Sequence, residues 1–224
     1  MNLSQRSSAP PARARRSDGA LLILAAAEAL FAERGYNAVP VSAIATRAGV
    51  SKANVFHHFK TKDRLYLTVL RRACGTATQV WRERMAGDGA FGERIRHAAR
   101  AHLLHLLEQE DVSRLILREV VENGPRRGPE LAEQVFDEDF AGLVQVIREA
   151  QHHGELRREA DPAVVASLLL GADVFFFLAR SVLIHMKAAT FAVDPERYSA
   201  LLTDYLLTGL APNDAAGPDA KSGR

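Results

Sequence analysis

Apolar residues recur every three or four positions along most of this chain, and no stretch alternates apolar and polar residues as a strand does. Gly, Pro and short polar breaks divide the periodic stretches. We therefore expect an all-α fold with helices over 18–34, 41–48, 52–59, 62–81, 90–107, 112–122, 129–153, 162–187 and 195–210. The segments 1–16 and 211–224 lack this period, and we expect them to be disordered.

Two short helices joined by a tight turn are expected between residues 41 and 59. Val41 and Ile44 give the first helix an apolar face. Gly49 can take the left-handed conformation that ends a helix, and Ser51 can cap the second helix by accepting a bond from a free backbone N–H. This spacing predicts a helix-turn-helix.

The second of these helices has two chemically different sides. Val55, Phe56 and Phe59 are expected to face the core, whereas the outward side carries Lys52, Asn54, His57 and His58. Amide and cationic donors on an exposed helix suit base edges and the phosphates beside them. Thr61 is expected to cap the next helix, where Lys62 in the first turn favours an anion such as a phosphate. The alternative is an ordinary solvated face on a three-helix unit.

Several positions of this region together resemble the DNA-binding signature of the tetracycline-repressor (TetR) family. They are Gly35-Tyr36, Ile44-Ala45, Ala48-Gly49-Val50-Ser51, Phe56-His57-His58-Phe59, Lys62 and Leu65, within residues 21–70. Two residues depart from the family pattern. Pro40 replaces the usual Ser or Thr that caps the first helix of the motif, a loss of about 1 kcal/mol. Phe56 replaces the usual Tyr, so a phosphate contact through a phenol hydroxyl is missing.

The resemblance implies a transcriptional regulator, usually a repressor, that binds a double-stranded DNA operator as a homodimer. It implies a DNA-binding domain over 17–70 and a helical effector-binding and dimerisation domain over 71–210. The DNA-contacting set that we expect is Ser42, Ser51, Lys52, Ala53, Asn54, Phe56, His57, His58 and Lys62. A small molecule that binds the second domain would release the operator by shifting the population of two states.

The distribution of charge agrees with this division. Residues 1–75 contain twelve Lys/Arg against four Asp/Glu, a balance of +8, whereas the whole chain carries only +2. A basic N-terminal third on a mildly acidic remainder is typical of a DNA-binding head attached to a sensing domain. The chain has one cysteine, and its first residues lack an apolar core, so we expect a cytoplasmic protein with no internal disulfide.

Polar residues on apolar helix faces suggest where an effector binds. Helical projection places His102 and Glu119 among apolar residues, and a buried polar group needs a partner. That partner is another side chain, a water or a ligand, and the two residues have only a structural role if they bond only to one another. The effector pocket that we expect, for a largely apolar molecule, is lined by His102, Leu103, Leu106, Ile116, Glu119, Val120, Phe136, Phe140 and Phe176.

The stretch 162–187 is apolar almost all round and must be covered on every side. Asp173 interrupts it and Arg180 follows closely, so packing within the chain and against a second copy is favoured over a membrane span. With the last helix it would form a four-helix dimer interface, as the resemblance implies. The interface residues that we expect are Leu169, Phe176, Val182, Leu202, Tyr205 and Leu206.

Other functional classes find less support in the sequence. His102 and His105 have a spacing that can bind a metal, with Glu119 as a third ligand, but no paired Cys or His-rich loop accompanies them. Cys74 next to Arg71 and Arg72 would allow a thiol switch if its pKa were lowered. A DNA-binding structural protein without an effector is a third alternative. No phosphate loop, nucleophile elbow or His-Glu-x-x-His motif occurs, so we expect no enzyme, cofactor or catalytic residue.

Overall fold

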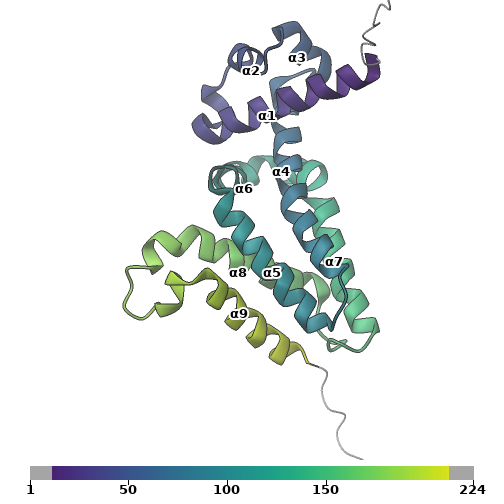
Figure 1. The fold of residues 1–224 in the computed structure, drawn as a ribbon, viewed down its shortest axis with the longest axis vertical. Helices are drawn as coiled ribbons and strands as arrows, with labels where there is room; N and C mark the ends of the chain where they lie inside the picture. The colour runs from purple at the N-terminus through teal and green to yellow at the C-terminus, as the bar shows by residue number, and fades with distance from the viewer. Residues whose placement is uncertain (1–11, 212–224) are drawn as a thin grey trace, which may run out of the picture. The chain divides into compact units, whose positions relative to one another are not determined.

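The computed structural model describes residues 12–211, with side chains from residue 18 onward, and within this range the chain contains helices and no strands. The helices are α1 (Ala12–Ala38), α2 (Val41–Arg47), α3 (Lys52–Phe59), α4 (Lys62–Met85), α5 (Phe91–Glu108), α6 (Glu110–Leu131), α7 (Asp137–His152), α8 (Pro162–Leu183) and α9 (Pro195–Leu210) (Figure 1). A π-helical turn, η1 (Ala132–Phe136), precedes α7, and a 3₁₀ turn, η2 (Thr190–Val193), precedes α9. The expected all-α fold is confirmed.

Several helix ends follow from local chemistry, as expected. Asp161 accepts bonds from the backbone N–H groups of Ala163 and Val164 at 2.8 and 3.1 Å, and Asp194 caps α9 through Arg197 at 3.0 Å. Each Asp is followed by Pro at the first helical position, where the missing N–H has no intrahelical partner to lose.

Other helix ends differ from the sequence-based expectation. Residues 12–16 belong to α1 instead of a disordered segment, so Asp18 lies inside the helix and does not cap it. The rest of the expected disordered segments, 1–11 and 212–224, lies outside the described residues. Gly35, with φ 76°, interrupts α1 as expected, although the helix resumes up to Ala38.

The largest difference concerns the middle of the chain. Asn123-Gly124-Pro125 was expected to end a helix, and Pro129 to begin the next, yet α6 continues through both prolines to Leu131. Pro125 has no backbone N–H and therefore cannot donate an intrahelical hydrogen bond. The Glu119 carboxylate accepts bonds from the side chains of Asn123 and Arg127, four and eight positions later, and these bonds support the helix across Pro125. The break comes instead at η1.

The chain divides into two compact units. Unit 1 comprises residues up to Ala73 together with Arg114–Val135, and unit 2 comprises Cys74–Ser113 and the residues from Phe136 onward. In unit 1 the core contains Ile23, Leu30, Phe31, Val39, Ile44, Val55, Leu65, Tyr66, Val69 and Leu70. The apolar periodicity of 18–34 would also place Leu21 in this core, but Leu21 is 55% exposed and Ile23 is buried instead.

The core of unit 2 lies among α5, α7, α8 and α9. It contains Trp81, Phe91, Ile95, Leu103, Leu143, Ile147, Val165, Leu169, Phe176 and Leu210. Helix α5 packs mainly on α9, and α7 packs on α8. Unit 2 therefore brings α5, α8 and α9 together around one apolar interior.

Candidate functional site

Helices α2 and α3 form the predicted helix-turn-helix in unit 1. Gly49 has φ 67° in the turn, and the N–H of Val50 donates to the carbonyl of Ala45 at 3.0 Å. Ser51 caps α3 by accepting a bond from the N–H of Asn54 at 3.1 Å. Pro40 precedes α2 without a side-chain cap, as its sequence implies. The Gly49 turn, the Ser51 cap and the missing side-chain cap at Pro40 are therefore as predicted.

The outer side of α3 is available to a ligand. Lys52, Ala53 and His57 are exposed, and Asn54 and His58 are partly exposed. Val55 is buried as expected, but Phe56 is 37% exposed, so its assignment to the buried side is wrong. The Lys52 ammonium lies 5.9 Å from the centre of the Phe56 ring. Consequently α3 presents a mixed surface of cationic, amide and aromatic groups. Ser42, also expected at this surface, is exposed on α2.

The start of α4 contains a contact that the sequence did not predict. Thr61 caps the helix as expected, since its hydroxyl accepts a bond from the Arg64 N–H at 3.0 Å. The Lys62 ammonium donates to the Tyr36 carbonyl at 2.5 Å and lies 4.2 Å from the centre of the Tyr36 ring. Burial lowers the pKa of Lys62. Lys62 thus holds the chain after Gly35 against α4, a structural role beside the DNA contact that we expected.

Glu119 belongs to a partly buried polar cluster within unit 1, which we call the Glu119 cluster: Glu119, Tyr66, Asn123, Arg127 and Asp63. The carboxylate of Glu119 accepts bonds from the Tyr66 hydroxyl at 3.0 Å, Asn123 at 2.9 Å and Arg127 at 3.4 Å. Arg127 also donates to Asp63 at 3.2 Å. Burial, followed by the negative charge of Glu119, raises the pKa of Tyr66. The cluster ties α6 to the first turns of α4.

His102 has a different partner, inside unit 2. Its Nδ1 lies 2.7 Å from Oδ2 of Asp173 on α8, and its ring centre lies 5.9 Å from that of Trp81. Asp173 has no exposed surface, and its other oxygen, Oδ1, has no hydrogen-bond partner. Burial raises the pKa of Asp173, while the bond to His102 opposes that shift. The suggested pairing of His102 with Glu119 is therefore wrong, since each has other partners.

Comparison with known proteins agrees with the geometry of unit 1. Residues 23–69 match the sequence profile of "Bacterial regulatory proteins, tetR family". The HTH-type transcriptional activator FasR of Mycolicibacterium smegmatis is 35% identical over 113 residues, which are 50% of this chain and 50% of FasR. Residues 23–69 of this chain therefore form a TetR-family DNA-binding domain. The chain matches half the length of FasR.

Solved structures share the fold of this chain over most of its length. A TetR-family transcriptional regulator described as putative, from Mesorhizobium loti MAFF303099, has a TM-score of 0.65 and 23% identity, covering 88% of this chain and 98% of its own. The fatty acid degradation regulator FadR from Bacillus halodurans has a TM-score of 0.68 and 18% identity, covering 84% of this chain and 98% of its own. At these identities the likeness concerns the fold alone.

The residues expected to line an effector pocket fall in both units. Ile116, Glu119 and Val120 belong to unit 1, where Val120 is 42% exposed instead of facing inward. The remaining residues belong to unit 2: His102, Leu103, Leu106, Phe136, Phe140 and Phe176. Among these, Leu103 and Phe176 are fully buried, and Phe176 stacks on Tyr198 with ring centres 4.4 Å apart. Asp173 and Trp81, which border His102, were not among the expected pocket residues.

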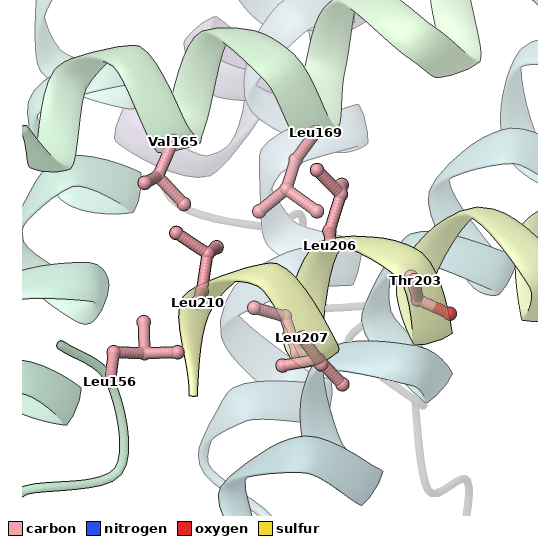
Figure 2. Close-up of a pocket in the computed structure, with 8 residues that line it drawn as sticks. Leu156, Val165, Leu169, Thr203, Leu206, Leu207 and Leu210 are labelled. Carbon is pink, nitrogen blue, oxygen red and sulfur yellow. The ribbon is translucent and has the colours of Figure 1, made fainter. Parts of the chain in front are cut away.

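A narrow apolar pocket lies between α5, α8 and α9 in unit 2. Its cavity volume is about 10 Å³, roughly the space of one water molecule. Figure 2 shows Val165 and Leu169 of α8 pointing toward Leu206 and Leu210 of α9. Side chains of the three helices therefore fill most of the space between them, and the pocket has no room for an effector in this conformation.

The expected dimer residues on α8 and α9 divide into exposed and buried groups. Val182 and Tyr205 are 63% and 72% exposed, whereas Leu169 and Phe176 are 3% and 0% exposed. Leu202 and Leu206 are partly buried. Assignment of Leu169 and Phe176 to a partner surface is wrong, because their side chains are already covered within their own subunit.

The outer face of α8 is apolar. Val164, Leu168, Phe175, Leu178 and Val182 are each at least 49% exposed and lie at helical spacing. Helix α8 is also long and apolar enough to cross a membrane, with a mean hydropathy of 2.1 and 33% of its most apolar window buried. Asp173, however, faces α5 and bonds to His102 there, which is the packing expected of a helix inside a helical bundle.

The surroundings of Cys74 and His105 shift the pKa values of both side chains. Burial, followed by the charge of Asp139, raises the pKa of the Cys74 thiol to about 12, opposite to the lowering that a thiol switch requires. Burial lowers the pKa of His105. Within the described residues, no group of three or more His, Cys, Asp or Glu is arranged to hold a metal.

Proposed function

We propose that this chain is a transcriptional regulator that binds a palindromic DNA operator as a homodimer and is released by a small, largely apolar molecule. The observation that carries the proposal is the capped helix α3 of the helix-turn-helix, with its cationic and amide groups exposed. A recognition helix needs these groups to contact phosphates and base edges in the major groove. The basic N-terminal third supplies long-range attraction for DNA.

We further propose that dimerisation uses the exposed apolar face of α8 and the neighbouring exposed residues of α9, Leu201 and Tyr205. An apolar face of this kind is stabilised when a second copy covers it. Two copies related by a two-fold axis would present two α3 helices to two half-sites. The half-sites would then lie about one helical turn apart, or somewhat wider.

The effector part of the proposal concerns unit 2. Its interior is rich in Leu, Val and Phe and contains a few buried polar groups, the composition typical of a site for an apolar molecule with one oriented polar group. The related fold of FadR, described as a fatty acid degradation regulator, makes an apolar effector a reasonable choice for this chain. An effector that prefers wrongly spaced recognition helices would weaken operator binding by its differential affinity for the two states.

The direction of regulation that we propose is repression. FasR, which shares half its length with this chain, is described as an activator, so direction must be measured. The experiment is selection of duplexes from a random pool by the purified chain, followed by a reporter gene placed behind the selected sequence. Repression requires lower reporter expression with the chain than without it. Higher expression would indicate an activator, and a pool with no enriched sequence would contradict operator binding itself.

A further inference from the structure

Two side chains that contact His102 in unit 2 each carry a buried polar atom without a hydrogen-bond partner. Nε1 of Trp81, on a side chain that is 3% exposed, has no hydrogen-bond acceptor. Oδ1 of Asp173, on a side chain with no exposure, has no hydrogen-bond donor. Both residues touch His102: Asp173 through its other oxygen at 2.7 Å, and Trp81 through a ring contact at 5.9 Å between centres.

Leaving such atoms unpaired is costly. A buried donor or acceptor without a partner loses the free energy of its bonds to water, and buried polar groups in folded proteins are therefore nearly always bonded. A carboxylate is the more costly of the two, because burial opposes its charge. A single group bound beside His102 and within reach of both side chains would give each atom a partner.

The chemistry of the two atoms defines that group. An indole N–H only donates a hydrogen bond, so this group must accept from Trp81. Oδ1 of Asp173 accepts when the carboxyl is ionised and can donate when it is protonated. A hydroxyl accepts from the indole and also donates to, or accepts from, the carboxyl, so it suits either protonation state. A hydrocarbon satisfies neither atom, and an ammonium cannot accept from Trp81.

We infer that Trp81, His102 and Asp173 orient the effector of this regulator, and that the effector is an apolar molecule with an alcohol or phenol hydroxyl. The inference rests on the proposed ligand-responsive function. Asp173 and Trp81 contact the hydroxyl, and His102 is a positioning residue that holds the Asp173 carboxyl through Oδ2. Phe176, stacked on Tyr198, belongs to the apolar surroundings.

Trp81 is the only tryptophan of the chain, so its fluorescence reports on this site alone. The experiment titrates the full chain with four probes of one chain length: 1-octanol, n-octane, octylamine and octanoate. A hydroxyl bonded to Nε1 should shift the Trp81 emission to longer wavelength in a saturable manner. Octanol is expected to bind at least tenfold more tightly than octane, since octane leaves both polar atoms unpaired.

Substitutions test the roles of the two contacts. Asp173→Asn should weaken octanol binding about tenfold and leave octane unchanged, whereas Asp204→Asn, an isosteric change on the exposed part of α9, should change neither. Trp81→Phe, followed by calorimetry, should have the same effect as Asp173→Asn. Trp81→Phe also tests the site if Asp173→Asn fails to fold.

Equal binding of octanol and octane would overturn the inference, as would tighter binding of octylamine or octanoate. Absence of any saturable shift would overturn it too and would indicate that water satisfies both atoms. Operator binding is measured in parallel without probes. A chain that binds its operator but no probe refutes this site and leaves the proposed regulator intact, whereas a chain that binds octanol but no duplex refutes the regulator.

Discussion

Asn54 stands in the first turn of α3, where its backbone N–H is held by Ser51 and its side chain is partly exposed. A side-chain amide can donate to and accept from one adenine edge at the same time, which makes it a sequence-reading group. The Lys and His side chains beside it carry donors for phosphate. Recognition and general attraction are thus expected from different residues of one helix.

Asn54→Ala should therefore weaken binding to the preferred operator by about 1–3 kcal/mol and relax base preference at one position in each half-site. The measurement is competition between the preferred duplex and duplexes with single base changes. Asn37→Ala, an exposed asparagine on the last turn of α1, is the matched control and should leave the preference unchanged. If Asn54→Ala weakened all duplexes equally, Asn54 would not read a base.

Lys62 combines a charged hydrogen bond to a carbonyl with a cation–π contact, both to Tyr36. Lys62→Met should lower the free energy of unfolding by about 1–2 kcal/mol, because both contacts are lost while the apolar stem remains. Lys60→Gln, at the neighbouring exposed lysine, should have little effect on stability. Urea unfolding of both variants measures the difference. Equal stability of Lys62→Met and the parent would show that Lys62 serves only DNA.

Cys74 provides a test of burial by its reactivity. With its pKa raised to about 12 from 9.0, the thiolate fraction at pH 8 is roughly 1000-fold lower than in an unfolded chain. A thiol reagent such as Ellman's reagent should therefore react slowly with the native protein and rapidly in urea. The raised pKa also implies that the stability contributed by the neutral thiol is lost as pH rises from about 9 towards 12. Rapid reaction of the native protein at pH 8 would contradict this expectation and would support a thiol switch at Cys74.

At the scale of elements, the Glu119 cluster connects α6 with the start of α4 inside unit 1. Glu119→Gln should destabilise the protein by about 1–3 kcal/mol, since a neutral amide replaces the charged acceptor of three donors and leaves Arg127 with a weaker partner. Glu122→Gln, on the exposed side of the same helix, should be nearly neutral. Thermal unfolding of the two variants gives the comparison, and equal melting temperatures would mean that the cluster contributes no stability.

Elements set by local chemistry could be predicted from the sequence, whereas those that depend on distant partners could not. The Ser51 cap, the Gly49 turn and the Asp161 start each involve residues within a few positions. Pro125 does not end α6, because support comes from contacts that become apparent only after folding. His102 was correctly expected to be buried, but its partner Asp173 lies 71 positions away. Periodicity identifies a buried polar residue without identifying its partner.

Helix α8 is a second element whose buried side could not be predicted from the sequence. Because it is apolar on nearly every side, its sequence does not reveal which side faces its own subunit. Phe175 and Phe176 are neighbours, yet Phe175 is 57% exposed and Phe176 is fully buried. Only the packing of α8 on α5 and α7 shows which face of α8 is exposed.

At the scale of the whole molecule, the proposed homodimer places a second copy of the chain on the exposed face of α8. Phe175→Glu should yield a folded monomer, because a charge on this face opposes its burial by a partner. Phe176→Glu should instead unfold the chain, since the charge would enter its core. Sedimentation gives the mass and circular dichroism the helix content. An intact dimer of Phe175→Glu would place the interface elsewhere.

The central claim, operator recognition by a dimer, is tested most directly by the mass of the complex with a selected palindromic duplex. Recognition by a dimer predicts two chains of 24.5 kDa bound to one duplex, and no stable complex when one half-site is scrambled. Sedimentation equilibrium at several protein concentrations measures both. A tight complex of one chain per duplex, unaffected by scrambling either half-site, would contradict the account.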